Sequence, residues 1–230
     1  MKKNGTLYLV STAIGNPDDI SLRAIRVLKS VDLILCEEWK HGKALLRFLD
    51  HEVELLNFNE HNHSERIPEI IDLLKQGKTI ALTSDCGTPV FSDPGLDLVQ
   101  ACYKNQIEVT AVPGASSLMN ALVLSGFPVD SFRSLGWLSP KRELRDQQLR
   151  QLIHETETTV IMETPYRLVQ LLESCQQVLG GKRVVAVCSR LTTEHEEVRR
   201  AELNQVLKHF KHAAEKMEFV LVIAGKNFKD

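Results

Sequence analysis

Two loops rich in turn-forming residues carry most of the polar groups that could bind a small molecule. The first spans residues 83–95, with the sequence TSDCGTPVFSDPG, and follows an apolar run over 79–82. It holds two Asp, two Gly and two Pro, which is typical of a rigid loop with accessible backbone groups. The second, VPGASS over 112–117, ends the apolar run 107–111. Because α/β folds bind ligands at the carboxyl ends of their strands, the two loops predict a small-molecule site.

The acidic residues of the first loop allow two interpretations. Asp85 and Asp93 could hold Mg²⁺, because hard cations prefer carboxylate oxygens in rigid loops. Asp beside Gly and Pro more often caps a turn, and we therefore predict no metal site. His61 and His63 lie too close in sequence for a helical pair of metal ligands, so a solvated loop is expected there.

Composition and missing motifs narrow the function classes. The sequence has no GxGxxG after its first strand, no GxxxxGK[ST] and no GxSxG. Its five Cys lack CxxC spacing, which favours reduced cytosolic thiols over disulfides or zinc ligands. The net charge is −2, so nucleic-acid binding would need a local basic patch. No apolar run approaches the ~20 residues that cross a bilayer, and we expect a cytoplasmic protein without membrane association.

Strand-like and helix-like segments alternate along the chain. The pattern predicts strands near residues 6–10, 31–36, 53–58, 79–82, 107–111, 132–137, 159–162, 183–188, 196–203 and 219–224. It predicts helices near 21–30, 43–49, 64–76, 96–103, 117–125, 142–154 and 165–179. This series predicts an α/β fold with mostly parallel or mixed sheets. We expect two α/β domains, 1–115 and 116–230, with a soft boundary near 114–120.

An ordered set of short motifs resembles one protein family. The motifs are LVSTAIGN (9–16), DISLRA (19–24), EHN (60–62), SDCGTP (84–89), SDPG (92–95), PG (113–114), ETPYRL (163–168), LT (191–192) and HEE (195–197). In order and spacing they resemble the small-subunit ribosomal RNA (cytidine-2′-O)-methyltransferases of the tetrapyrrole methylase superfamily. The resemblance covers nearly the whole chain. It implies two α/β domains with S-adenosyl-L-methionine in a cleft between them, and usually a homodimer.

The same resemblance implies a set of cofactor contacts. They would be Asn16, Ser84, Asp85, Cys86, Val90 or Phe91, Ser116, Ser117, Met162 and Leu191. Polar side chains and backbone donors would hold the methionine carboxylate and the ribose, and Met162 with Leu191 could give adenine an apolar slot. Met162 could equally be a core residue at a strand end.

The implied reaction is methyl transfer to a ribose 2′-hydroxyl of small-subunit ribosomal RNA. A ribose hydroxyl is a poor nucleophile, so a base or a polarising cation should lie near it. The candidates follow strands of the first domain, although each could be a surface turn residue: Glu37, Glu38, Glu60 and His61. The sequence does not choose among them.

Contacts to RNA, free or in a ribosomal subunit, need basic and stacking groups. The most basic stretch, with Trp137 within it, contains Arg133, Lys141, Arg142, Arg145 and Arg150. A solvated amphipathic helix would give the same pattern. Lys40 is a further candidate for substrate contact. It stands where the family usually ends its second strand with Glu-Asp-Thr-Arg, and Lys lacks the bidentate grip of Arg on phosphate.

Two rival functions stay open. A tetrapyrrole (porphyrin precursor) C-methyltransferase would use the same fold. The first loop of those enzymes looks like Gly-x-Gly-Pro-Gly-Asp, whereas this chain reads IGNPDD over 14–19. A catalytically silent cofactor- or RNA-binding ribosome factor is the other rival, because Trp39 and Lys40 depart from the family pattern.

Overall fold

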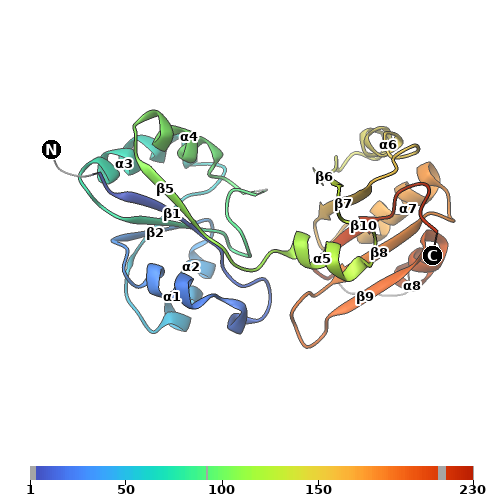
Figure 1. Cartoon of the computed structure of the whole chain (residues 1–230), viewed down its shortest axis with the longest axis horizontal. Coiled ribbons are helices and arrows are strands. Elements are labelled where there is room, and N and C mark those ends of the chain that lie inside the picture. Colours follow the sequence, from blue (N-terminus) through green and yellow to red (C-terminus); the bar gives the residue numbers. More distant parts are fainter. Residues whose placement is uncertain (1–3, 92, 212–215, 230) are drawn as a thin grey trace. The chain divides into compact units, whose positions relative to one another are not determined.

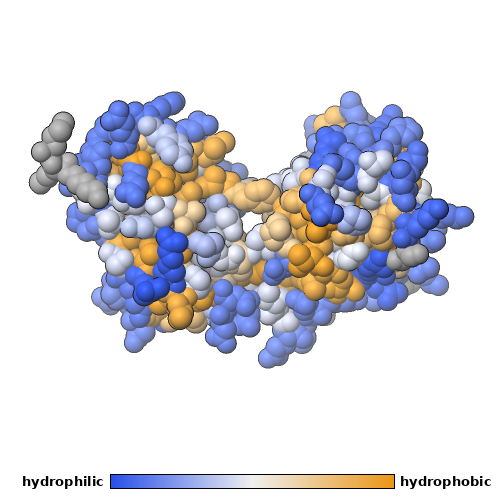
Figure 2. Space-filling view, in the orientation of Figure 1, coloured by the Kyte–Doolittle hydropathy of each residue, from blue (hydrophilic) through white to orange (hydrophobic). Residues whose placement is uncertain are grey.

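The computed structural model describes residues 4–91, 93–211 and 216–229. The chain forms two compact units, Met1–Ser116 and Ser117–Asp230, each built around a five-stranded sheet (Figure 1). Hydrophilic residues cover much of the visible surface of each unit, with apolar residues gathered in patches between them (Figure 2). Among the described residues, no helix combines the length and apolar character needed to cross a bilayer.

The first unit contains an entirely parallel sheet in the order β3-β2-β4-β1-β5. Its strands are β1 (Thr6–Val10), β2 (Leu33–Cys36), β3 (Glu54–Asn57), β4 (Ile80–Thr83) and β5 (Glu108–Val112). Its helices are α1 (Leu22–Leu28), α2 (Trp39–Leu49), α3 (His63–Lys75) and α4 (Leu96–Lys104), with a 3₁₀ turn at Pro17–Asp19. Helices α1 and α2 cover one face of the sheet, and α3 and α4 cover the other (Figure 1).

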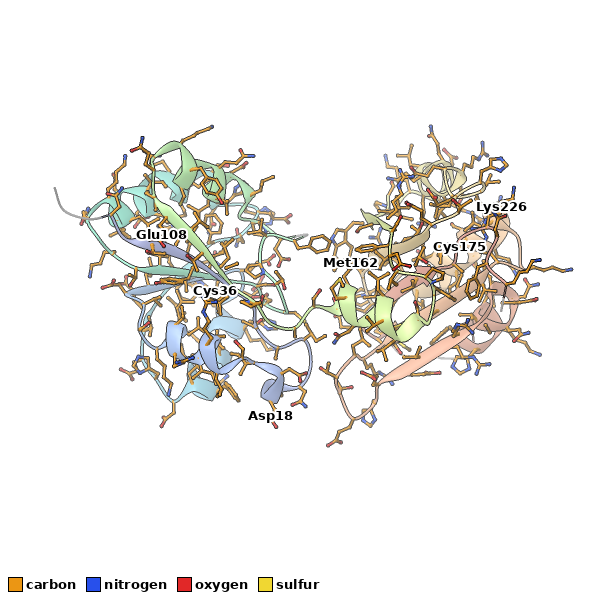
Figure 3. All side chains as sticks on the ribbon, viewed as in Figure 1. Asp18, Cys36, Glu108, Met162, Cys175 and Lys226 are labelled. Atoms are coloured by element: carbon orange, nitrogen blue, oxygen red, sulfur yellow. The ribbon has the colours of Figure 1, made fainter. Side chains whose placement is uncertain are left out.

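The local sequence explains these elements. Every residue of β2 and β4 is buried, as expected for parallel strands covered on both faces. Ser21 caps α1, where its Oγ accepts the Ala24 N–H at 3.0 Å. Helix α2 begins four residues before the predicted start at 43, because tertiary packing outweighs the low helix propensity of Gly42. A Cβ at Gly42 would lie 2.7 Å from Cys36 Sγ, inside the first unit (Figure 3), so only glycine allows this approach.

The second unit contains a mixed sheet in the order β6-β7-β10-β8-β9. Its strands are β6 (Phe132–Trp137), β7 (Thr158–Glu163), β8 (Val184–Ser189), β9 (Glu197–Glu202) and β10 (Phe219–Ile223). Only β6 and β7 pair in parallel, and the other pairs are antiparallel. Its helices are α5 (Ser117–Ser125), α6 (Arg142–Arg150), α7 (Leu168–Leu179) and α8 (Leu203–Lys211). Residues of α6, α7 and α8 share one core with the sheet, including Cys175 of α7 (Figure 3).

The alternation of strands and helices predicted from the sequence is confirmed, with one omission. The omission is helix α8, because the pattern over 196–203 predicts a strand that runs to Leu203 and no helix after it. The edge strand β9 ends at Glu202, and α8 follows at once. Leu203, Val206, Leu207 and Phe210 are buried at helical spacing, so the signal was present in the sequence.

Candidate active site

Five loops leave the carboxyl ends of the first sheet. We name them by the strand that each follows: the β1 loop (11–16), β2 loop (37–38), β3 loop (58–62), β4 loop (84–95) and β5 loop (113–116). Because β1 lies between β4 and β5, the two loops recognised in the sequence flank the β1 loop. The candidate site therefore begins from one edge of one sheet.

Hydrogen bonds join the three central loops. The Thr12 N–H donates to Gly87 O at 2.9 Å. The Ser11 hydroxyl donates to Thr88 Oγ1 at 3.1 Å, and the Thr88 hydroxyl donates to Ala115 O at 3.3 Å. The β4 and β5 loops are thus linked directly and also through the β1 loop, which fixes their backbones relative to each other.

Two glycines allow this close packing. Gly87 adopts φ +82°, and a Cβ there would lie 3.0 Å from Ile14 Cγ2. A Cβ at Gly114 would lie 2.9 Å from Ser11 Cβ. In the same loop as Gly87, Val90 has φ 73°, a left-handed conformation that is rare for a β-branched residue. The surrounding contacts hold this strained backbone, a feature that gathers at ligand-binding sites.

A group of carboxylates lies where the β2 and β4 loops meet. The Glu38 N–H donates to Asp85 Oδ1 at 3.2 Å. Burial, and then the charges of Asp93, Asp85, Glu38 and Glu60, raise the pKa of Glu37 to about 7. A carboxyl group with this pKa exchanges its proton near neutral pH, as a general base must.

The two aspartates of the β4 loop share this environment. Burial raises the pKa of Asp85, opposed by the hydrogen bond from the Glu38 N–H and by the charge of His41. Burial also raises the pKa of Asp93, opposed by a hydrogen bond from Ser84. Mutual repulsion and desolvation thus destabilise the ionised state of the group, and a bound cation would relieve both. Among the described residues, no three His, Cys, Asp or Glu side chains are arranged to hold a metal ion.

Two other candidate bases, Glu60 and His61, lie in the β3 loop and face solvent. The side chains of His61 and Glu60 are 83% and 77% exposed, and their nearest charged atoms lie 3.5 Å apart. Asparagines that the sequence analysis overlooked anchor this loop: Asn62 Nδ2 donates to Asn57 Oδ1 at 2.8 Å, and Asn57 Nδ2 donates to Glu37 O. Asn57 is the last residue of β3 and Asn62 directly precedes α3, so asparagines at the two ends of the loop were the available signal.

The predicted cofactor residues of the first unit lie in these loops with different exposure. Asn16 is exposed, and its Oδ1 accepts the Asp18 N–H at 3.0 Å. Ser84 is buried, and its Oγ accepts the Cys86 N–H at 3.1 Å, so it shapes the β4 loop. Cys86 and Phe91 are exposed, whereas Val90, Asp85 and Ser116 are partly buried.

The remaining predicted cofactor residues belong to the second unit. Met162 (labelled in Figure 3) is partly buried near the end of β7. Its backbone lies opposite Val220 of β10. Leu191 is buried in the turn after β8, between two residues with positive φ. Ser117 begins α5. That these residues contact the cofactor stays a prediction.

Several residues of the basic stretch in the second unit already have partners within the protein, which the sequence did not indicate. Arg133 pairs with Glu155 at 3.5 Å, and Arg142 lies 3.8 Å from Asp146. Arg145 is only 4% exposed, and its guanidinium donates to Ser139 O, Pro140 O and Ser174 Oγ. Arg145 thus joins α6 to α7, and this corrects its predicted role as a direct RNA contact. Lys141 remains exposed.

Comparison with known proteins places this geometry in a family. Residues 6–207 match the family model described as Tetrapyrrole (Corrin/Porphyrin) Methylases. The chain belongs to this family. Two relatives are named ribosomal RNA small subunit methyltransferase I. The protein from Synechocystis sp. is 41% identical over 98% of this chain and 81% of its own length. The protein from Thermotoga maritima is 39% identical over 96% of this chain and 99% of its own.

Solved structures of the tetrapyrrole methylase fold superpose on nearly all of the chain. Diphthine synthase gives a TM-score of 0.74 at 15% identity, covering 98% of this chain and 92% of its own. Uroporphyrin-III-C-methyltransferase from Thermus thermophilus gives 0.66 at 20% identity, covering 96% and 94%. At these identities the likeness shows the fold alone.

Like other tetrapyrrole methylases, this protein is an S-adenosyl-L-methionine-dependent methyltransferase. Its first unit fits that cofactor. The sulfonium and the α-amino group are cationic, and Glu37, Asp85 and Asp93 supply partly buried negative charge at the site edge. Val90 and Phe91 add apolar surface in the same loop, of the kind that an adenine ring requires.

Proposed function

We propose that this tetrapyrrole methylase methylates a ribose 2′-hydroxyl of small-subunit ribosomal RNA. The relatives at about 40% identity carry that RNA in their names, which supports the substrate class. The observation that carries the chemistry is Glu37, a partly buried carboxylate with a pKa of about 7 beside the β4 loop. An oxygen acceptor needs such a base, whereas an exposed carboxylate with an ordinary pKa would be a weaker one.

The cofactor supplies an electrophilic methyl group, and the protein must hold it and deprotonate the acceptor. Asp85 and Asp93 would face its cationic groups, while Asn16 and the β4 and β5 loops would position its polar ends. Because the hydrogen bonds among these loops already fix their geometry, little ordering remains to be done on binding. Such positioning contributes ~7–11 kcal/mol in well-oriented reactions.

Glu37 would accept the proton from the ribose hydroxyl. Of the four candidates named from the sequence, Glu37 alone combines partial burial with a pKa near neutrality. The side chains of Glu60 and His61 are mostly in water and lie close to each other. Glu38 is exposed, and its backbone N–H orients Asp85. We therefore assign the base to Glu37 and the support of the β4 loop to Glu38.

Transfer of tritiated methyl groups tests this function. Small ribosomal subunits from a strain that lacks the gene should accept label from S-adenosyl-L-methionine, and nuclease digestion should place it on a ribose. A Glu37→Gln protein that still binds the cofactor serves as the control. Label in porphyrin precursors would instead support the tetrapyrrole C-methyltransferase, and binding without any label would support the silent ribosome factor.

We also propose a homodimer, as the family resemblance implies. Light scattering at several protein concentrations should give about twice the chain mass of 26.0 kDa. A constant mass of one chain would refute the dimer without affecting the assignment of the reaction.

A further inference from the structure

Helix α2 of the first unit displays a row of cations. Lys40, Lys43 and Arg47 are all exposed, and their spacing of three and four residues places them along one side of the helix. The row extends from residue 40 to residue 47, a rise of about 10 Å along the helix axis. It begins only three residues after Glu37, so an acceptor held along it would approach the proposed base.

Counter-charges for these cations are absent from the part of the chain that the structure describes. Among the described residues, no carboxylate lies within 4.0 Å of the charged groups of Lys40, Lys43 or Arg47. Two exposed lysines elsewhere do have carboxylate partners: Lys78 pairs with Asp32 at 2.9 Å and Lys211 with Glu173 at 3.1 Å. In a chain with a net charge of −2, an unneutralised row of this kind is a local positive surface.

The row borders a hollow in the surface. Its volume is about 800 Å³, and its lining comprises Lys40, Lys43, Leu46, Arg47, Asp50, His51 and Glu52. The two acidic residues lie beyond the carboxyl end of α2, so the amino-terminal part of the hollow is lined by the cations. An anionic ligand therefore fits the part nearest Glu37.

Exposed aromatic side chains accompany the cations. Trp39 is 47% exposed, and Lys43 Nζ lies 6.0 Å from the centre of its ring. Phe48, at the other end of α2, is 46% exposed. Positive groups that follow a backbone, next to aromatic rings on which bases stack, are the combination that single-stranded nucleic acids require.

We propose that Lys40, Lys43 and Arg47 bind the phosphates of single-stranded RNA and that Trp39 stacks on one of its bases. This inference rests on the proposed function. It extends the RNA contact from Lys40, to which the family pattern pointed, to a whole helix face in the first unit. Unstacked RNA suits the face, because a ribose hydroxyl must reach a partly buried carboxylate.

A triple substitution tests the surface. Lys40→Gln, Lys43→Gln and Arg47→Gln together should weaken binding of a 20-nucleotide single-stranded RNA at least tenfold in about 0.1 M salt. The slope of log K against log salt should become shallower by about 2, because each phosphate contact contributes ~0.7 on single strands. Calorimetric binding of S-adenosyl-L-methionine should be unchanged for Lys43→Gln with Arg47→Gln, which leaves Lys40 beside the site in place.

The matched control removes the same charge from the opposite face of the sheet. Arg66→Gln, Lys75→Gln and Lys104→Gln on α3 and α4 also change the net charge from −2 to −5, that is −2 minus 3. This control should retain most of the affinity and of the salt dependence. Equal losses in both triple variants would show that only overall charge matters and would overturn the proposal.

Two further outcomes separate this inference from the proposed function. Trp39→Ala should weaken single-stranded RNA binding about tenfold but leave duplex RNA of the same length unaffected. An equal loss for duplex RNA would overturn the assignment to single strands.

If the wild-type protein methylates ribosomal RNA but the triple α2 variant binds RNA normally, the α2 surface is refuted and the proposed function stands. Wild-type protein that transfers no methyl group to RNA would refute the proposed function.

Discussion

Carboxylates have opposite environments at the two edges of the first sheet, the amino edge where the strands begin and the carboxyl edge where they end. At the amino edge, Asp32 precedes β2 and accepts hydrogen bonds from Lys78 Nζ, the Thr79 N–H and the Thr79 hydroxyl. The hydrogen bond from Lys78, followed by that from the Thr79 N–H, lowers the pKa of Asp32 to about 2. At the carboxyl edge, directly after the last residue of β2, burial and neighbouring carboxylates raise the pKa of Glu37 to about 7.

This difference separates a carboxylate whose charge is stabilised by the fold from one whose charge is destabilised. Asp32 has donors for both oxygens, so its charge stabilises the folded chain. Glu37 faces other carboxylates in a partly buried position, so its charge destabilises the folded chain. Binding of a proton or a cation would relieve this destabilisation. A fold keeps such an arrangement where catalysis benefits from it, because perturbed pKa values gather at active sites.

The largest expected effect is on the rate of methyl transfer. Glu37→Gln keeps the size of the side chain but cannot accept a proton, and we expect kcat to fall about 10²- to 10⁴-fold. Wild-type kcat/KM should rise with pH up to about 7, where Glu37 loses its proton, and then level off. Single-turnover assays from pH 5.5 to 8.5 measure both. If the variant kept the wild-type rate and profile, the base would lie elsewhere.

A substitution in the β4 loop should lower the affinity for the cofactor, whereas a substitution at the amino edge of the sheet should not. Asp85→Asn retains an oxygen for the Glu38 N–H but removes a negative charge, and the Kd for S-adenosyl-L-methionine should rise about tenfold or more. The neutral thioether product should lose less affinity, because it lacks the sulfonium charge. Titration calorimetry compares the two ligands, with Asp32→Asn as the control. Equal losses for both ligands would contradict the charge argument.

A smaller effect is expected on stability, with opposite signs at the two edges. The folded pKa of Glu37 lies above its ordinary 4.5, so its contribution to the free energy of unfolding falls as pH rises from about 4.5 to 7. Glu37→Gln should therefore stabilise the protein at pH 8 by about 1–2 kcal/mol, allowing for solvent screening, and by much less at pH 4.5. Urea unfolding at the two pH values checks this. Destabilisation at pH 8 would show that the carboxylate is satisfied.

The smallest effect is expected at Asp32. Its folded pKa of about 2 lies below its ordinary 3.8, so its stabilising contribution is complete above about pH 4 and is lost as pH falls toward 2. Asp32→Asn should lower the free energy of unfolding by only about 0.5–1 kcal/mol at pH 7, because solvent screens a pair whose side chains are 38% and 53% exposed. The same urea measurements apply, with the exposed Asp72→Asn as reference. A neutral result would remove the contrast between the edges.

Particular residues show how far prediction from sequence reached. Ser21 marked the start of α1, and the turn residues over 83–95 marked the β4 loop, because both signals depend on neighbours in the chain. Gly42 obscured the start of α2, because the contact that demands glycine is with Cys36. Arg145 looked like a surface cation, but its three acceptors lie on other turns and on α7.

The sequence by itself determined the alternating strands and helices, the turn-rich loops and the ordered motifs that identified the family. These features are local, since periodicity and turn chemistry are properties of nearby residues. Only the tertiary structure gave Glu37 a burial and a pKa that set it apart from the other three candidates. Likewise, only the folded chain showed that no described carboxylate lies within 4.0 Å of the α2 cations. Strand order brings Glu37 beside Asp85 and Asp93, and burial, mutual repulsion and missing counter-charges arise only from residues far apart in the chain.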